Sequence, residues 1–106
     1  MRIYGLKNCD SCRKAKKALP EAELVDVREV GVSDELLARA HAQFGDALLN
    51  TRSTTWRNLD DVDRALPPLA LLKAHPAVMK RPFIEAGDQL FIGWNKGIEQ
   101  EVQALL

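Results

Sequence analysis

The sequence predicts an α/β domain with a four-stranded mixed sheet, helices on its faces and a helical insertion. The apolar patterns run in the order strand, helix, strand, helical block, strand, strand, helix over 106 residues. No convincing strand occurs between Gly31 and Pro76. A strand, a crossing helix and a second strand favour a parallel pair, and a terminal hairpin can extend that sheet in the antiparallel sense.

The N-terminal part of the chain reads as a strand, a helix and a second strand. Residues 1–6 ("MRIYGL") form a short apolar run that stops at the turn-prone pair "KN". In "RKAKKAL" the apolar residues recur at three-to-four spacing, the lysines are expected to face water, and Pro20 ends the helix. "AELVDVRE" then alternates until Gly31 interrupts it, which predicts the second strand.

The middle of the chain reads as helical. "SDELLARAHAQFG" begins with Ser33 as an expected N-cap, carries two acids in its first turn and closes on Gly45. "LDDVDRAL" and "PPLALLKAH" predict two shorter helices, the second with proline at its start, where the missing N–H is harmless. We interpret residues 31–75 as a helical insertion.

The C-terminal part predicts a hairpin and a helix. "PFIEAGDQLFIGW" holds two apolar runs about a Gly-Asp turn. "KGIEQEVQALL" places Ile98, Val102 and Leu105 or Leu106 on one face of a closing helix. We expect one domain over residues 1–106, with its sheet core formed by 1–30 and 76–106.

Composition and charge argue against several classes of protein. Fifteen basic and fifteen acidic residues leave no overall positive field to drive nucleic-acid binding, so no direct nucleic-acid partner is expected. No apolar run approaches the roughly 20 residues that cross a bilayer, so no membrane partner is expected. The two cysteines lie too close together to close a long loop, unlike those of secreted mini-domains, which favours the reducing cytoplasm.

The two cysteines, Cys9 and Cys12, stand in "NCDSC" at the predicted start of the first helix. A structural zinc site needs four ligands, and only His41 and His75 could complete one, at a spacing unlike any ligand motif. No metal is therefore expected. The sequence has no glycine-rich phosphate-binding loop, so no tightly bound cofactor is expected either. Two small buried hydrophobes remain an alternative for the pair.

Redox chemistry is the favoured interpretation of the cysteine pair. A helix N-terminus favours a thiolate at Cys9, and the neighbouring cations Lys7, Arg13 and Lys14 act in the same direction. A second thiol one helical turn later can attack a disulfide formed at the first. Ser11, between the cysteines, either caps the helix or tunes the thiolate, and capping is the commoner role.

Three longer stretches resemble one known family. They are "MRIYGLKNCDSCRKAKKAL", "LLNTRSTTWRNL" and "HPAVMKRPFIEAGDQLFIGW", in this order over nearly the whole chain. Together they resemble the glutaredoxin-dependent arsenate reductase family (ArsC) with its Spx and YffB branches, and "TTWR" is most similar to the YffB branch. The resemblance implies a thioredoxin-like fold with a helical insertion, which agrees with the order of elements given above.

The resemblance also implies roles for single residues. The family's attacking cysteine matches Cys9, and the arginines that bind the oxyanion match Arg52 of "NTR" and Arg81 of "KRP". Guanidinium groups suit that role because their planar forks match oxyanions and carboxylates. Pro82 matches the cis-proline that faces the active cysteine in thioredoxin-like folds.

These matches give a candidate site with some structural alternatives. Arg52 could instead end a helix, and Arg81 could pair with Glu85 at the surface. Trp56 and Trp94 are treated as packing residues, and the histidines are left unassigned. The candidates are Cys9 and Cys12 for catalysis, Arg13, Arg52 and Arg81 for anion binding, and Asn8, Ser11 and Pro82 in support.

The expected function is that of a thiol-dependent reductase of the arsenate reductase-like family. Glutathione or glutaredoxin would be the reductant, with glutathione as a co-substrate, and the substrate would be a disulfide, a glutathione adduct or arsenate. Where arsenate reductases carry a third arginine, "GWNKGIEQE" offers only Asn95 and Lys96, which leaves the substrate open. The alternatives are an Spx-like redox regulator that binds the RNA polymerase alpha subunit and a binding module without activity.

Overall fold

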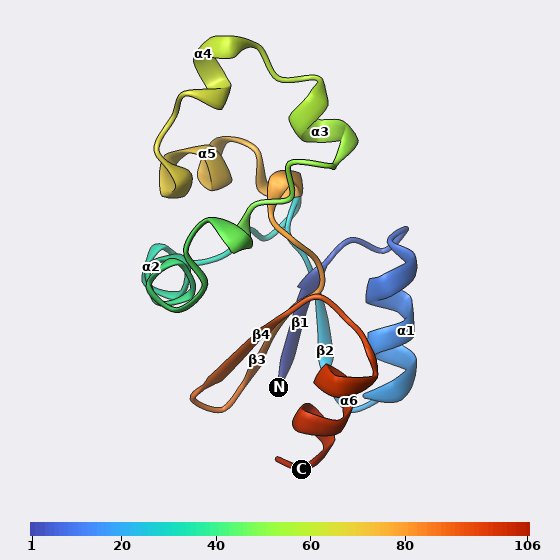
Figure 1. Cartoon of the computed structure of the whole chain (residues 1–106). Helices are drawn as coiled ribbons and strands as arrows, with labels where there is room; N and C mark the ends of the chain where they lie inside the picture. The colour runs from blue at the N-terminus through green and yellow to red at the C-terminus, as the bar shows by residue number, and fades with distance from the viewer. The chain divides into compact units, whose positions relative to one another are not determined.

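The computed structural model describes residues 1–106 and contains one four-stranded sheet and six α-helices (Figure 1). Two short 3₁₀ helices, η1 and η2, accompany them. In chain order the elements are β1 (Arg2–Gly5), α1 (Asp10–Ala18), β2 (Glu23–Asp26), α2 (Asp34–Phe44), η1 (Gly45–Leu48), α3 (Thr54–Arg57), α4 (Asp61–Arg64), α5 (Pro68–Ala74), η2 (Pro76–Val78), β3 (Phe83–Ala86), β4 (Gln89–Ile92) and α6 (Lys96–Gln103).

The sheet has the mixed topology that the sequence predicts. Its strand order is β2-β1-β3-β4. β1 and β2 run parallel, with Tyr4 opposite Val25, while β3 is antiparallel to both β1 and β4. The hairpin between β3 and β4 turns at Gly87, whose φ of 61° is a backbone conformation that glycine adopts readily. The α/β class, the parallel pair and the terminal hairpin are thereby confirmed.

The chain forms two compact units, residues 1–30 with 81–106, and residues 31–80. The first unit contains the whole sheet, and α1 and α6 cover one of its faces (Figure 1). The core residues on this face are buried and apolar, and those from the strands share the face because successive side chains of a strand alternate between the two faces of a sheet. They are Ile3, Ala15, Leu19, Ala22, Ile84 and Val102.

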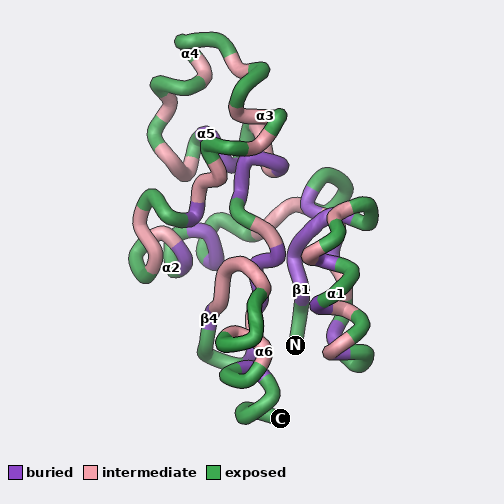
Figure 2. The backbone as a smooth tube through the Cα atoms, turned by 45° about the vertical axis from the view of Figure 1, so that its right-hand side comes forward, coloured by how far each residue is buried: buried purple, intermediate pink, exposed green.

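The second unit, residues 31–80, is helical. Ser33 caps α2 by accepting a hydrogen bond from the Leu36 N–H at 3.2 Å, and Gly45 ends the helix at a φ of 60°, as the sequence predicts. The only strand-like feature of this unit is an isolated bridge between Leu49 and Met79. Figure 2 shows that α3 and α4 carry exposed and half-buried residues but no buried ones.

Three details differ from the sequence-based expectations. α3 was not predicted, although Ser53 caps it by accepting from the Trp56 N–H at 3.1 Å. α6 ends at Gln103, so Leu105 and Leu106 lie beyond the helix and are exposed instead of extending its apolar face. Lys16 does not simply face water, because its Nζ donates to the Pro20 and Ala22 carbonyls and closes the C-terminal end of α1.

None of the helices has the length and the apolar character that crossing a membrane requires.

Candidate functional site

Cys9 is the N-cap residue of α1. Its backbone is extended, its N–H donates to the Leu6 carbonyl at 3.2 Å, and its own carbonyl accepts the Arg13 N–H at 3.0 Å. The Cys9 side chain makes no capping hydrogen bond and is half-buried. The thiol therefore lies at the positive end of a nine-residue helix and remains partly open to solvent.

Cys12 differs from Cys9 in that its side chain is fully buried. Burial raises the pKa of the Cys12 thiol to about 12, and a hydrogen bond with Cys9 and the negative charge of the Cys9 thiolate act in the same direction. A backbone hydrogen bond with Leu6 opposes this rise in pKa. Both cysteines are free thiols, and at neutral pH Cys12 keeps its proton.

Two residues that the sequence analysis missed, Gly5 and Leu6, complete the surroundings of the Cys12 sulfur. A Cβ atom at Gly5 would overlap the Cys12 Sγ atom and lie 3.2 Å from the Cys12 Cβ. The signal was present, because a lone glycine inside an apolar strand often marks a close approach by another group. We call the space bounded by Gly5, Leu6 and Cys9 the sulfur site.

Arg81 and Pro82 reach the same region from the other end of the chain. The peptide bond between them is cis, as the resemblance implies, and Pro82 is fully buried. Although burial raises the pKa of Cys12, the positive charge of Arg81 lowers it, so the guanidinium acts electrostatically on the Cys12 thiol. Arg81 itself is half-buried.

The candidates next to the cysteines have separate local roles. The Arg13 Nε donates to the Lys7 carbonyl at 3.0 Å, and its Nη1 lies 4.0 Å from an oxygen of Asp10. This contact ties the turn before Cys9 to the first turn of α1. Asn8 is exposed in that turn. Ser11 is half-buried inside the helix and is not its N-cap residue, because Cys9 holds that position.

Arg52 belongs to the second unit, residues 31–80. It is exposed, and its backbone N–H donates to the Asn50 side chain at 3.1 Å in the turn that precedes α3. The assignment of Arg52 to the anion-binding site stays a prediction.

The region that would supply a third arginine has a structural role in part. The Asn95 side chain caps α6 by accepting the Ile98 N–H at 2.9 Å. That contact engages the side-chain oxygen of Asn95 in helix capping. Lys96 begins the helix and is exposed.

The two histidines and Trp56 contact charged side chains in residues 31–80. His41 and His75 pair with Asp46 at 3.8 Å and with Asp63 at 3.3 Å. The Arg64 guanidinium lies 5.7 Å from the ring centre of Trp56. No three histidine, cysteine, aspartate or glutamate side chains gather where they could hold a metal ion.

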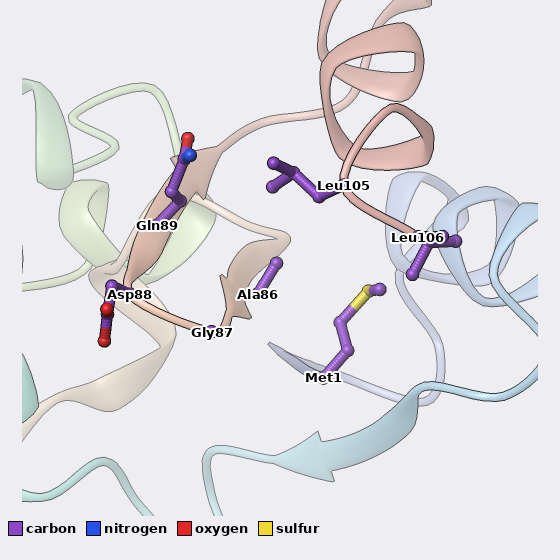
Figure 3. A pocket seen from close by; sticks show the side chains of 7 residues that line it. All are labelled: Met1, Ala86, Gly87, Asp88, Gln89, Leu105 and Leu106. Atoms are coloured by element: carbon purple, nitrogen blue, oxygen red, sulfur yellow. The ribbon is translucent and has the colours of Figure 1, made fainter.

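A cavity of about 420 Å³ opens near the chain termini (Figure 3). Leu105 and Leu106 face Met1 across it, and the β3–β4 turn closes another side. β1 begins next to Met1 and ends at Gly5, so this cavity lies at the end of the strand away from the cysteines. None of the candidate site residues lines it.

Known proteins resemble this chain over nearly its full length. An uncharacterized protein of Haemophilus influenzae is 43% identical to it and the match covers 96% of this chain and 95% of the relative. The global transcriptional regulator Spx of Bacillus subtilis is 28% identical, with 98% of this chain and 85% of the relative covered.

Solved structures agree with these sequence matches. A YffB protein superposes with a TM-score of 0.81 at 32% identity, covering 99% of this chain and 97% of its own. An arsenate reductase (ArsC) related protein from Brucella melitensis gives a TM-score of 0.67 at 28% identity, and the match covers 94% of this chain and 91% of the Brucella protein. The thioredoxin-like α/β fold is thereby confirmed. The ArsC family model matches residues 4–102, and the chain belongs to the ArsC family.

Proposed function

We propose that this protein is a thiol-disulfide oxidoreductase in which Cys9 attacks and Cys12 resolves. The observation that carries the proposal is the difference between the two cysteines. Cys9 is partly open at the N-terminus of α1, whereas Cys12 is buried one turn later and hydrogen-bonded to it. An attacking thiol that solvent can reach and a protected partner are the arrangement that intramolecular resolution of a mixed disulfide needs.

The first step forms a mixed disulfide on Cys9. The Cys9 thiolate attacks one sulfur of a disulfide R–S–S–R′, the S–S bond breaks, and R′–S⁻ leaves with the electron pair and takes a proton from solvent. Arg81 lies within electrostatic range of Cys12 and would hold a carboxylate of a glutathione moiety or an oxyanion. Arg52 and Arg13 are the further candidates for binding that anion.

The second step releases the product. Once Cys9 is in a disulfide, it bears no negative charge, so one influence that raises the pKa of Cys12 disappears while burial remains. Cys12 then loses its proton and attacks Cys9, forming the Cys9–Cys12 disulfide and expelling R–SH. Two molecules of glutathione, or a reduced glutaredoxin, return the pair to the dithiol and become oxidised to a disulfide. We place this reaction in the cytoplasm, where such thiols are kept reduced.

Arsenate is the other substrate compatible with this site. Cys9 and one glutathione would supply the two electrons that convert arsenate to arsenite, leaving water and a mixed disulfide on Cys9. The relative from Brucella melitensis that is described as arsenate reductase-related supports this branch. Of the two residues in place of the third arginine, Lys96 is the better candidate to bind an oxyanion, because it is exposed and positively charged, whereas Asn95 is neutral and caps α6.

The experiment that tests the proposal follows NADPH consumption with glutathione, glutathione reductase and glutaredoxin present. Cys9→Ser should reduce turnover of a glutathione mixed disulfide to the blank. Arg81→Ala should lower kcat/KM about tenfold or more, since a hydrogen bond to a charged group contributes about 1.5–3 kcal/mol. Arg2→Ala is the matched control, because Arg2 is an exposed arginine that pairs with Glu23 and Glu85 at the other end of β1 from the cysteines.

The results separate the substrates and the alternative function. Turnover of arsenate would identify an arsenate reductase, and turnover of the mixed disulfide alone a glutathione-linked thiol reductase. No Cys9-dependent turnover of either would contradict the enzymatic proposal. The similarity to Spx then favours a redox-sensing regulator, for which a pull-down with the C-terminal domain of the RNA polymerase alpha subunit is the test.

A further inference from the structure

We infer that Gly5 is a positioning residue of the cysteine pair: the Cβ that Gly5 lacks leaves the space that the Cys12 sulfur occupies, which keeps Cys12 buried behind Cys9. The inference rests on the proposed function only in the role it gives to Cys12 as the resolving thiol. Gly5 touches neither substrate nor reductant in this scheme, and it acts through Cys12.

The backbone of Gly5 gives no other reason for a glycine. The glycines with a positive φ are Gly31, Gly45, Gly87 and Gly93, so Gly5 has a conformation that alanine can adopt. Gly5 lies in β1, where a glycine weakens a strand by roughly 0.5–1 kcal/mol relative to alanine. Its place in the strand is therefore unfavourable locally, and the explanation must come from what packs against it.

The contact that packs against Gly5 is the side chain of Cys12. A Cβ at Gly5 would overlap the Cys12 Sγ and approach the Cys12 Cβ to 3.2 Å. Neither side can retreat easily. The Gly5 carbonyl accepts the Val27 N–H at 3.0 Å in the parallel pairing with β2, and Cys12 is held in α1. A larger residue at position 5 must push the sulfur out of its site or push α1 away from the strand.

The position of this sulfur determines how the two thiols divide their roles. In the sulfur site Cys12 is shielded from solvent and hydrogen-bonded to Cys9, so an external reagent meets Cys9 alone. A displaced Cys12 sulfur would gain access to water and would ionise at lower pH, because burial is the largest cause of its raised pKa. Gly5→Ala should therefore make Cys12 a second reactive thiol.

A double-mutant cycle tests the contact itself. Urea unfolding under reducing conditions would compare wild type, Gly5→Ala, Cys12→Ala and the double variant. Gly5→Ala should lower the folding equilibrium constant about tenfold or more, as overpacking does. In the Cys12→Ala background, Gly5→Ala should alter the folding equilibrium constant less than about threefold, since the new methyl group fills the space of the missing sulfur. Equal losses in both backgrounds would overturn the inference.

The cycle also covers a Gly5→Ala protein that does not fold. If the double variant folds, the sulfur is the obstacle and the inference stands. If neither Gly5→Ala nor the double variant folds, another neighbour of Gly5 is the obstacle and the inference fails. Gly97→Ala is the matched control, because its added Cβ would approach only the Asn95 side chain, at 3.3 Å, far from either cysteine in sequence.

A second readout distinguishes positioning from general destabilisation. In a Cys9→Ser background, the rate of iodoacetamide alkylation at Cys12 is measured from pH 7 to pH 10. Adding Gly5→Ala should raise this rate at least tenfold and move its pH profile to lower pH, while adding Gly97→Ala should leave both unchanged. An unchanged rate would contradict the inference. Neither readout uses reductase turnover, so a failure of the proposed function and a failure of this inference are distinguishable.

Discussion

As pH rises above 9, the free energy of unfolding should fall less in Cys12→Ala than in wild type. The pKa of Cys12 is raised from 9.0 to about 12 in the folded protein, with burial as the main cause. Above pH 9 the unfolded chain releases this proton while the folded chain retains it, so unfolding becomes more favourable. The stabilising contribution is thus fully present below pH 9 and is lost as pH rises toward 12.

The size of the effect follows from the shift. Each pH unit between the two pKa values corresponds to about 1.4 kcal/mol, which gives a loss of about 2 kcal/mol at pH 10.5. Cys12→Ala removes the titrating thiol and also leaves a small void, but the cost of the void does not depend on pH. The other ionisable groups titrate in both proteins. From pH 8 to pH 10.5 the free energy of unfolding of wild type should therefore fall by about 2 kcal/mol more than that of Cys12→Ala.

Urea unfolding followed by circular dichroism, with a reductant that is not a thiol, measures this difference at intervals between pH 8 and pH 10.5. Ser33→Ala serves as a control, since it removes a helix cap without removing a group that titrates in this range. Its free energy of unfolding should stay parallel to that of wild type. If the free energy of unfolding of Cys12→Ala also stays parallel to that of wild type, the assignment of Cys12 as buried and protonated is refuted.

Three other predictions concern reactivity and stability. Native protein at pH 7.5 should take up one iodoacetamide group, at Cys9, and a second group at Cys12 only after denaturation. Mass spectrometry of peptides would show which cysteine is alkylated. Comparable alkylation rates at both cysteines would contradict the assigned roles. Asn95→Ala should lower the free energy of unfolding by about 1 kcal/mol in urea without changing kcat/KM, whereas a loss of turnover would give Asn95 a binding role. Ile84→Val should cost about 1 kcal/mol in the same measurement, and no measurable cost would mean that residue 84 is not in the packed core.

Local patterns in the sequence were sufficient for most of the fold. Periodicity of two and of three to four identified the strands and the longer helices, and Ser33 and Gly45 marked the ends of α2 because their chemistry is local. α3 was missed because Trp56 is its only large apolar residue, so no repeated apolar spacing marks it, and its Ser53 cap is a weak signal alone. The end of α6 was overestimated because apolar residues continue beyond Gln103 without a stop signal.

The candidate site was predictable only in part, because its residues interact across the chain. The position of Cys9 at a helix start follows from its neighbours in sequence. The burial of Cys12 does not, since the same helical position could face water or the sheet. Gly5 gave the missing information, but a glycine in a strand has several explanations until its contact is known. For Arg52, the family resemblance remains the ground for its assignment.

The register of the sheet explains why Arg81 and Pro82 accompany the cysteines. β3 pairs with β1 in the antiparallel sense, with Ile3 opposite Ile84 and Tyr4 opposite Phe83. Continued by one residue, this register brings Pro82 opposite Gly5, the residue whose missing side chain accommodates the Cys12 sulfur. A shift of one residue would move Pro82 away and turn Ile84 from the core to the other face, at a large cost in buried apolar surface. The hydrophobic core that selects the register thus also sets Arg81 at the cysteine pair, so stability of the sheet and assembly of the site depend on the same pairing.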